Sequence, residues 1–244
     1  MQTGQPAKMR QLKLALRAAF PRTVPVMVGY LFLGAAFGIL LESKGYGFGW
    51  AALMSIFIYA GSMQFVAVDL LATGAGFLQV ILMTLMVNIR HVFYGISMLG
   101  KFRNLGAKKP YMIFSLTDET FSLLCTAEPP KNVDRNWFFF FIALFNQLYW
   151  IVGSVVGGLL GSSFSFNTQG IDFAMTALFV VILVNQLKKA DRYFPFIIGG
   201  VSAIFWLIFV EKQYFLVCAL ATTMIGLIAI FEREKLQMKE EENE

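Results

Sequence analysis

The most constraining feature of this sequence is a series of eight long apolar runs that contain almost no charged residue. A helix needs about 20 mostly apolar residues to cross a hydrocarbon layer about 30 Å thick, and most of the runs approach that length. Only 14% of the 244 residues are charged, against about a quarter in a soluble domain. The runs are Thr23–Leu41, Phe48–Val68, Phe77–Leu99, Tyr111–Ala127, Trp137–Gly161, Phe173–Leu187, Phe194–Val210 and Gln213–Phe231. The pattern excludes a water-soluble domain and predicts an all-α, polytopic integral membrane bundle of six to eight membrane segments.

Positive charges indicate how these runs cross the membrane, because Lys and Arg collect in cytoplasmic loops. Eight crossings would place 13 bases on the cytoplasmic side and 6 on the other. If Phe77–Leu99 and Tyr111–Ala127 instead enter and leave on one side, the division becomes 17 to 2. The charges therefore favour six crossings with two broken or re-entrant segments over eight crossings. Both arrangements place the two termini in the cytoplasm.

Polar segments flank the apolar region at both ends. Between Lys8 and Phe20, apolar residues recur at helical spacing opposite basic ones. This spacing predicts a short interfacial helix within a basic cytoplasmic segment, residues 1–22. Residues 232–244 carry six acids and three bases and form a charged cytoplasmic tail, so the transmembrane domain is expected at residues 23–231. Loops that face the anionic lipid bilayer explain the excess of bases elsewhere, and no nucleic-acid partner is expected.

The third run carries the deepest charge of the sequence. Asn88, Arg90 and His91 interrupt it, and helical spacing places Tyr94 near Arg90. An ionisable residue in hydrocarbon costs about 2.5–3.5 kcal/mol, so it needs a partner, a path to water or a function. The guanidinium could hold a carboxylate through two parallel hydrogen bonds, and the only histidine could exchange a proton near neutral pH. In the alternative, Arg90 reaches the interface or pairs with Asp69, and His91 is a packing residue.

Two adjacent carboxylates, Asp118 and Glu119, interrupt the fourth run. Burying both in the ionised form would be costly, so we expect at least one to be protonated, paired with a cation or exposed to water. They are candidates for a proton carrier or for the counter-charge of Arg90. The alternative is an interfacial loop whose acids face water.

Small and polar residues also interrupt the second run, at Tyr59, Gly61, Ser62 and Gln64. Such a stretch can loosen a helix and free backbone groups, as in the discontinuous helices of transporters. It can equally allow close helix packing. Packing is the interpretation that we favour for two further sets of glycines at four-residue spacing, one beginning at Gly34 and one at Gly153.

Nothing in the sequence indicates an enzyme. The motifs of nucleotide-binding loops and zinc proteases are absent, and one histidine cannot form a typical catalytic metal site. A pair made of Ser62 or Ser97 with His91 is the enzymatic alternative, and no oxyanion-hole motif accompanies it. We therefore expect no enzymatic activity, no metal and no cofactor.

The polar islands of the chain, read in order, resemble the AzlC family over about residues 12–231. The islands are FPRTVPVMVGYLFLGAAFG (20–38), YAGSMQFVAVDLL (59–71), NIRHVFYGIS (88–97), LTDETFSL (116–123) and IDFAMTALFVVILVNQ (171–186). The resemblance implies the large subunit of a bacterial branched-chain amino acid exporter in the plasma membrane, which works with an AzlD-type small membrane subunit. It further implies export of leucine, isoleucine, valine or methionine, or of toxic analogues of these amino acids, driven by an ion gradient.

The resemblance also singles out candidate site residues, which are Tyr59, Gly61, Ser62, Gln64, Asn88, Arg90, His91, Tyr94, Asp118 and Glu119. We expect His91, Asp118 and Glu119 to serve proton coupling and the other seven to serve substrate binding. In this hypothesis Arg90 holds the substrate carboxylate, and Asp118 or Glu119 holds the ammonium group or the coupling proton. The alternatives are a passive channel that uses the same islands as a filter, or a structural subunit whose partner carries the site.

Overall fold

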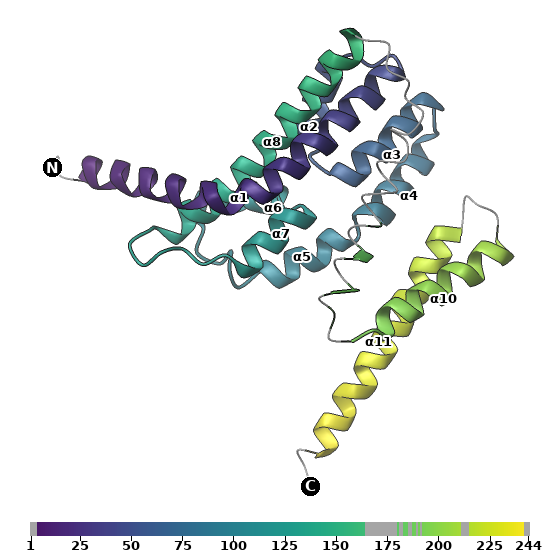
Figure 1. The fold of residues 1–244 in the computed structure, drawn as a ribbon. Helices are drawn as coiled ribbons and strands as arrows, with labels where there is room; N and C mark the ends of the chain where they lie inside the picture. Colours follow the sequence, from purple (N-terminus) through teal and green to yellow (C-terminus); the bar gives the residue numbers. More distant parts are fainter. Residues whose placement is uncertain are drawn as a thin grey trace. The chain divides into compact units, whose positions relative to one another are not determined.

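A computed structural model of the chain describes residues 4–163, 192–210 and 215–241, with isolated positions at 180, 183–184, 187–188 and 190. The described residues are mostly helical and contain no strand. They belong to two units, Met1–Thr176 and Ala177–Glu244. The helices of the first unit are α1 (Gly4–Ser43), α2 (Phe48–Phe57), α3 (Gly61–Ala72), α4 (Phe77–Asn88), α5 (Arg90–Met98), the 3₁₀ turn η1 (Gly106–Lys108), α6 (Lys109–Phe114), α7 (Asp118–Thr126) and α8 (Arg135–Ser163) (Figure 1). Most of the predicted run Phe173–Leu187 lies outside the described residues. The same holds for most of the polar island at residues 171–186.

Helices α1 and α8 run side by side and form the scaffold of the first unit (Figure 1). Glycines let their backbones approach closely. A Cβ atom added at Gly34 would lie 3.0 Å from main-chain atoms of α8, and one at Gly153 would lie 2.8 Å from main-chain oxygens of α1. Gly38 and Gly157 leave even less room. The two predicted packing seams are therefore confirmed as one shared interface.

Helix α1 is longer than the sequence predicts, because it continues without interruption through Pro21 and Pro25. The expected interfacial helix and the first expected span thus form one helix, which changes direction along its length (Figure 1). Prolines remove a helical hydrogen bond and commonly produce such kinks. Ala15 and Ala19 hold the first part of α1 in place, since both are fully buried in a cluster that includes Phe138 of α8.

Two apolar clusters fill the first unit, and α8 contributes to both. One gathers around Phe138 and Ile142 near the start of α8, and the other around Phe37, Phe65 and Trp150. Asn146 and Gln147 lie between these two sets along α8 and are themselves buried. A polar layer therefore separates the two apolar clusters.

Three of the predicted runs are broken into two helices each. The second run is broken between α2 and α3, the third at Ile89 between α4 and α5, and the fourth between α6 and α7. The α4 and α5 axes differ by 45°. The expected interruptions of the third and fourth runs are thus confirmed. In the second run, the loosened helix proves to be the correct alternative.

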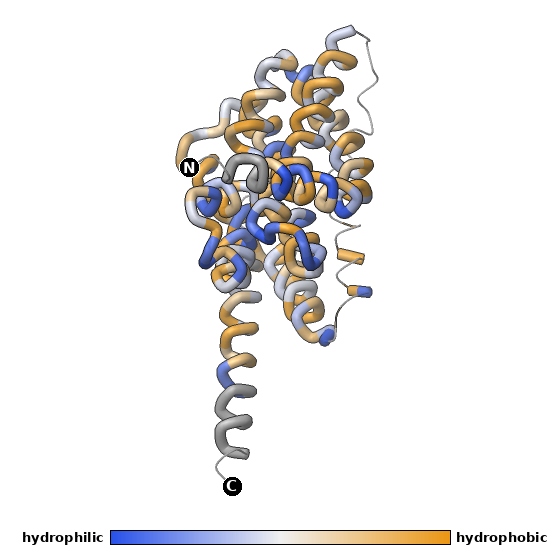
Figure 2. Tube along the Cα trace, turned by 90° about the vertical axis from the view of Figure 1, so that its left-hand side faces the viewer, coloured by the Kyte–Doolittle hydropathy of each residue, from blue (hydrophilic) through white to orange (hydrophobic). Residues whose placement is uncertain are grey.

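The surface of the described residues is rich in large apolar side chains. Phe77 is 82% exposed, Phe32 and Phe57 are each 72% exposed, and Ile208 is 71% exposed. The helices are largely hydrophobic, with shorter hydrophilic stretches within and between them (Figure 2). Within the described residues, α1 and α8 are long and apolar enough to cross a membrane, and α4 with α5 would make a third crossing if counted as one span. Six to eight crossings remain a prediction.

The second unit contains α10 (Phe194–Phe209) and α11 (Phe215–Glu241), which pack against each other. Ser202 Oγ donates a hydrogen bond to the Ala219 carbonyl at 2.9 Å, and Trp206 Nε1 donates one to Thr222 Oγ1 at 2.8 Å. Helix α11 extends well past the predicted end of its run. Most of the charged tail is therefore helical.

Candidate functional site

Arg90, the first residue of α5, joins three broken runs. Its NH1 group lies 3.1 Å from Asp118 Oδ2, and its NH2 group donates to Ser62 Oγ at 2.8 Å. Ser62 is in the first turn of α3 and Asp118 begins α7, so the starts of three helices meet at one guanidinium. The side chains of Arg90 and Asp118 are 27% and 19% exposed. We call Ser62, Arg90, Tyr94 and Asp118 the Arg90 cluster.

Tyr94 completes this cluster. Its hydroxyl donates to Asp118 Oδ1 at 2.6 Å, and its ring stacks on Phe121 with centroids 4.4 Å apart. Both oxygens of Asp118 are therefore occupied, one by Tyr94 and one by Arg90. The expected neighbours Arg90 and Tyr94 meet through this shared carboxylate.

The electrostatics of the Arg90 cluster suit a bound anion. Helix N-termini carry partial positive charge and free N–H groups, and the starts of α3, α5 and α7 converge here. Among the described residues, no side chain caps the start of α3, whereas Thr117 caps α7 by accepting from Thr120 N. Arg90 adds a full positive charge. Asp118 neutralises part of this potential, and the uncapped start of α3 still offers donors.

Two buried polar atoms beside the cluster make no hydrogen bond among the described residues. They are Arg90 Nε and Asn88 Oδ1. Nε and NH2 form one edge of the guanidinium group, and that edge holds only the Ser62 hydroxyl. A planar carboxylate fits such an edge through two parallel hydrogen bonds, and NH1 could keep its bond to Asp118.

The other residues predicted around Arg90 lie slightly apart from it. His91 Nδ1 is 3.1 Å from the Asn88 carbonyl, within the helix break, and the described residues show no hydrogen bond from His91 to either carboxylate. Asp69 is exposed and takes no part in the ion pair. The alternative in which Arg90 pairs with Asp69 is therefore wrong.

A second set of polar groups leads from α7 to α8, and we call it the Glu119 chain. The Tyr30 hydroxyl lies 2.7 Å from Glu119 Oε2 and 2.6 Å from Thr117 Oγ1. Thr117 Oγ1 is 2.9 Å from Thr120 Oγ1, to which Asn146 Nδ2 donates at 3.0 Å. Tyr30, Thr117, Thr120 and Asn146 are not among the candidate site residues that the sequence predicts. A hydroxyl or an amide within an apolar helix gives only a weak signal.

The remaining predicted residues pack against α8. Trp150 Nε1 donates to Gln64 Oε1 at 2.9 Å, and a Cβ atom at Gly61 would lie 3.3 Å from the Trp150 ring. Tyr59 is 3% exposed and has a φ of 44°, which is uncommon for a residue with a side chain. Gln147 Nε2 donates to the Ile56 carbonyl at 3.1 Å and so satisfies the broken end of α2. These contacts hold the α2–α3 break in its shape.

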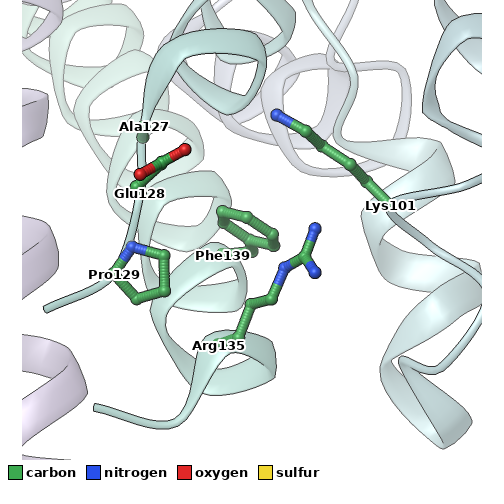
Figure 3. Close-up of a pocket in the computed structure, with 6 residues that line it drawn as sticks. All are labelled: Lys101, Ala127, Glu128, Pro129, Arg135 and Phe139. Atoms are coloured by element: carbon green, nitrogen blue, oxygen red, sulfur yellow. The ribbon is translucent and has the colours of Figure 1, made fainter. Parts of the chain in front are cut away.

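A separate hollow of about 260 Å³ lies where α7 ends and α8 begins (Figure 3). Its lining comprises Lys101, Ala127, Glu128, Pro129, Arg135 and Phe139. Lys101 Nζ donates to the carbonyls of Leu124 and Cys125 at 2.6 and 2.8 Å and so caps the end of α7. None of the predicted site residues lines this hollow. Among the described residues, no three His, Cys, Asp or Glu side chains are grouped to hold a metal ion.

Comparison with known proteins finds a matching family and several similar proteins. The family described as AzlC protein matches residues 25–164, which is more than half of the sequence. The branched-chain amino acid transport protein AzlC of Bacillus subtilis (strain 168) is 44% identical over 227 residues, which cover 93% of this chain and 89% of that protein. The chain belongs to the AzlC family.

Other AzlC relatives extend the comparison. An uncharacterized membrane protein of Helicobacter pylori (strain ATCC 700392 / 26695) is 42% identical over 90% of this chain and 96% of that protein. The inner membrane protein YgaZ of Escherichia coli (strain K12) is 29% identical over 68% of this chain and 71% of its own length. No solved structure matches the sequence. The AzlC match includes all ten candidate site residues and confirms the family expected from the polar islands.

Proposed function

We propose that this AzlC-family membrane protein is a secondary active transporter that exports branched-chain amino acids across the bacterial plasma membrane. The name of the Bacillus subtilis relative supports the substrate class. The observation that carries the proposal is the Arg90 cluster, a partly buried guanidinium at three helix starts whose Nε atom has no hydrogen-bond partner among the described residues. Transporters commonly bind substrate at such discontinuous helices.

The substrate is a zwitterion, and the cluster offers a group for each of its charges. The carboxylate binds the Nε and NH2 edge of Arg90 and is helped by the free N–H groups at the start of α3. The ammonium group binds Asp118 or Glu119. The branched side chain packs against neighbouring apolar residues, which supply most of the surface of a small-molecule site.

Export against a gradient needs a coupling ion, and a proton is the ion that these side chains suit. Asp118 forms an ion pair with Arg90, Glu119 follows Asp118 in the first turn of α7, and the His91 ring contacts the Asn88 carbonyl across the adjacent break. Movement of the half-helices about their breaks would expose the cluster to each side in turn. The chain acts in this proposal as the large subunit beside a small membrane subunit of the AzlD type.

Efflux from intact cells tests the proposal. Cells without their own exporters are loaded with a leucine-containing dipeptide, and leucine release is measured with and without the small subunit. Arg90→Gln should reduce release to the background level, because the carboxylate loses its charged partner. Arg103→Gln changes an exposed arginine outside the cluster and should leave release intact. Normal release by Arg90→Gln at equal membrane expression would contradict the assignment.

The same assay separates a coupled carrier from a passive channel. Uphill release should collapse when an uncoupler removes the proton gradient. Release that runs only downhill and survives the uncoupler would instead indicate a channel. Full release without the small subunit would contradict the two-component arrangement.

A further inference from the structure

The Glu119 chain is a continuous line of hydrogen-bonding groups that the transport proposal leaves without a role. It passes from Glu119 through Tyr30, Thr117 and Thr120 to Asn146, and successive atoms are 2.7, 2.6, 2.9 and 3.0 Å apart. It thereby joins α7 to α1 and α8, the two scaffold helices.

The interior of this chain is shielded from solvent. Thr120 and Asn146 are fully buried, and Tyr30 and Thr117 are 4% and 7% exposed. Buried hydroxyl and amide groups need hydrogen-bond partners inside the protein. Their protons must therefore be distributed over contacts inside the protein, which are those within the chain and the contact of Thr120 with the nearby buried Tyr59 hydroxyl.

Counting these protons gives two possible orders. The hydroxyls of Tyr30, Thr117 and Thr120 hold one proton each, and the three contacts from Glu119 to Thr120 need one proton each. When Glu119 is ionised, Tyr30 donates to Glu119 and Thr117 donates to Tyr30. Thr120 must then turn its hydroxyl to donate to Thr117, in place of the Thr117-to-Thr120 bond of the structure, while it accepts from Asn146 Nδ2. When Glu119 is protonated, it donates to Tyr30, and every hydroxyl then donates toward α8.

The second order leaves the Thr120 hydroxyl with a proton to donate at the α8 end. Asn146 Oδ1 is buried, has no hydrogen-bond partner among the described residues, and belongs to the amide that already contacts Thr120. A half-turn of this amide exchanges its nitrogen for its oxygen and supplies an acceptor. Each hydroxyl of the chain can donate or accept, whereas Asn146 must turn its amide to change from donor to acceptor.

We propose that protonation of Glu119 reverses the donor order of the Glu119 chain and turns the Asn146 amide, so that α8 responds to the protonation state of α7. This inference rests on the transport proposal only in taking Glu119 as the proton-binding residue. The hydroxyls of Tyr30, Thr117 and Thr120 reverse their donor direction, and the Asn146 amide turns in response. All four are positioning residues, because they act through Glu119.

Other titratable and charged groups face Glu119 from neighbouring elements. They are Tyr30 on α1, Tyr59 between α2 and α3, Arg90 and Tyr94 on α5, and Asp118 on α7. Tyrosines are uncharged near neutral pH, and Arg90 and Asp118 form an ion pair with each other. We place the change of charge within this group at Glu119.

The side-chain amide of Asn146 reports the reversal directly. Full-length protein labelled with ¹⁵N in asparagine is placed in lipid nanodiscs, and its amide signals are recorded from mildly acidic to mildly alkaline pH. The side-chain amide signal that disappears in the Asn146→Leu variant is assigned to Asn146. We expect the Asn146 signal to shift with pH in the unmodified protein and to become independent of pH in Glu119→Gln.

Two substitutions at Thr120 test whether the chain transmits the change. Thr120→Val keeps the shape of the side chain and removes the hydroxyl, so it should abolish the shift of the Asn146 signal. Thr120→Ser keeps the hydroxyl and should preserve the shift. An Asn146 signal that is constant with pH in the unmodified protein, or that still shifts in Thr120→Val, would overturn the inference. This readout needs no transport, so its failure is distinguishable from failure of the exporter assignment, which efflux tests.

Discussion

At the scale of the residue, the ion pair of Arg90 and Asp118 organises the site. Its shielding means that removing one partner leaves the other charge poorly compensated. Asp118→Asn should lower the free energy of unfolding by about 1.5–3 kcal/mol, the range for a lost hydrogen bond to a charged group. Thermal unfolding in detergent measures the loss. Asp69→Asn, at an exposed position on α3, serves as the control and should unfold like the unmodified protein.

A double-substituted protein sharpens this prediction. In the Arg90→Gln background the ion pair no longer exists, so adding Asp118→Asn should have little further effect. Equal losses in both backgrounds would show that the two side chains are not coupled.

The sequence located the charged members of the site but not their pairing. Arg90, Asp118 and Glu119 were recognisable because charges are rare in apolar runs, and each must be compensated. Spacing along one helix could suggest Tyr94 for Arg90, but it could not choose between Asp69 and Asp118. That choice depends on which helix starts meet in space. Tyr30 and Asn146 were missed because an isolated hydroxyl or amide is compatible with an apolar helix.

At the scale of the element, the glycine seam between α1 and α8 holds the scaffold together. A Cβ atom at Gly157 would collide with the main chain of Ala35, and adding atoms to a packed interface typically costs about 1–3 kcal/mol. Gly157→Ala should therefore lower the unfolding temperature markedly. Gly29→Ala adds the same atom on α1 where nothing lies within 4 Å, and it should be tolerated. Equal unfolding temperatures for the two variants would refute this role of the seam.

Helix breaks were easier to predict than helix continuity. Polar residues inside apolar runs indicated the breaks of the third and fourth runs, since freed backbone groups in a membrane need polar partners. For the second run they left a loosened helix and close helix packing equally open. The continuity of α1 through Pro21 and Pro25 was not predicted. Prolines usually end or kink a helix, but burial of Ala15 and Ala19 in a cluster with residues of α8 supports the part of α1 before them.

At the scale of the whole molecule, the first unit gathers two connecting segments and the first part of α1 at one end of α8. Asn136 Nδ2 donates to the Asn104 carbonyl at 2.8 Å, Lys108 Nζ lies 3.9 Å from the centre of the Trp137 ring, and the Asp134 N–H donates to Gln11 Oε1 at 3.3 Å. The first part of α1, the α5–α6 connection and the α7–α8 connection are therefore neighbours. This grouping supports α6 and α7 as a segment that enters and leaves on one side, as six crossings require.

Labelling of single cysteines tests this topology. Cys125 and Cys218 are first replaced by serine, and cysteine is then introduced at Asn104 or Asn132, which are both exposed. A reagent that cannot cross the membrane should label both positions from the cytoplasmic side, because the α5–α6 and α7–α8 connections share the end of α8 where Gln11 lies. Ser43→Cys, at the far end of α1, should be labelled from the opposite side. Labelling of positions 104 and 132 from opposite sides would instead require α6 and α7 to cross the membrane together, and it would establish the arrangement of eight crossings.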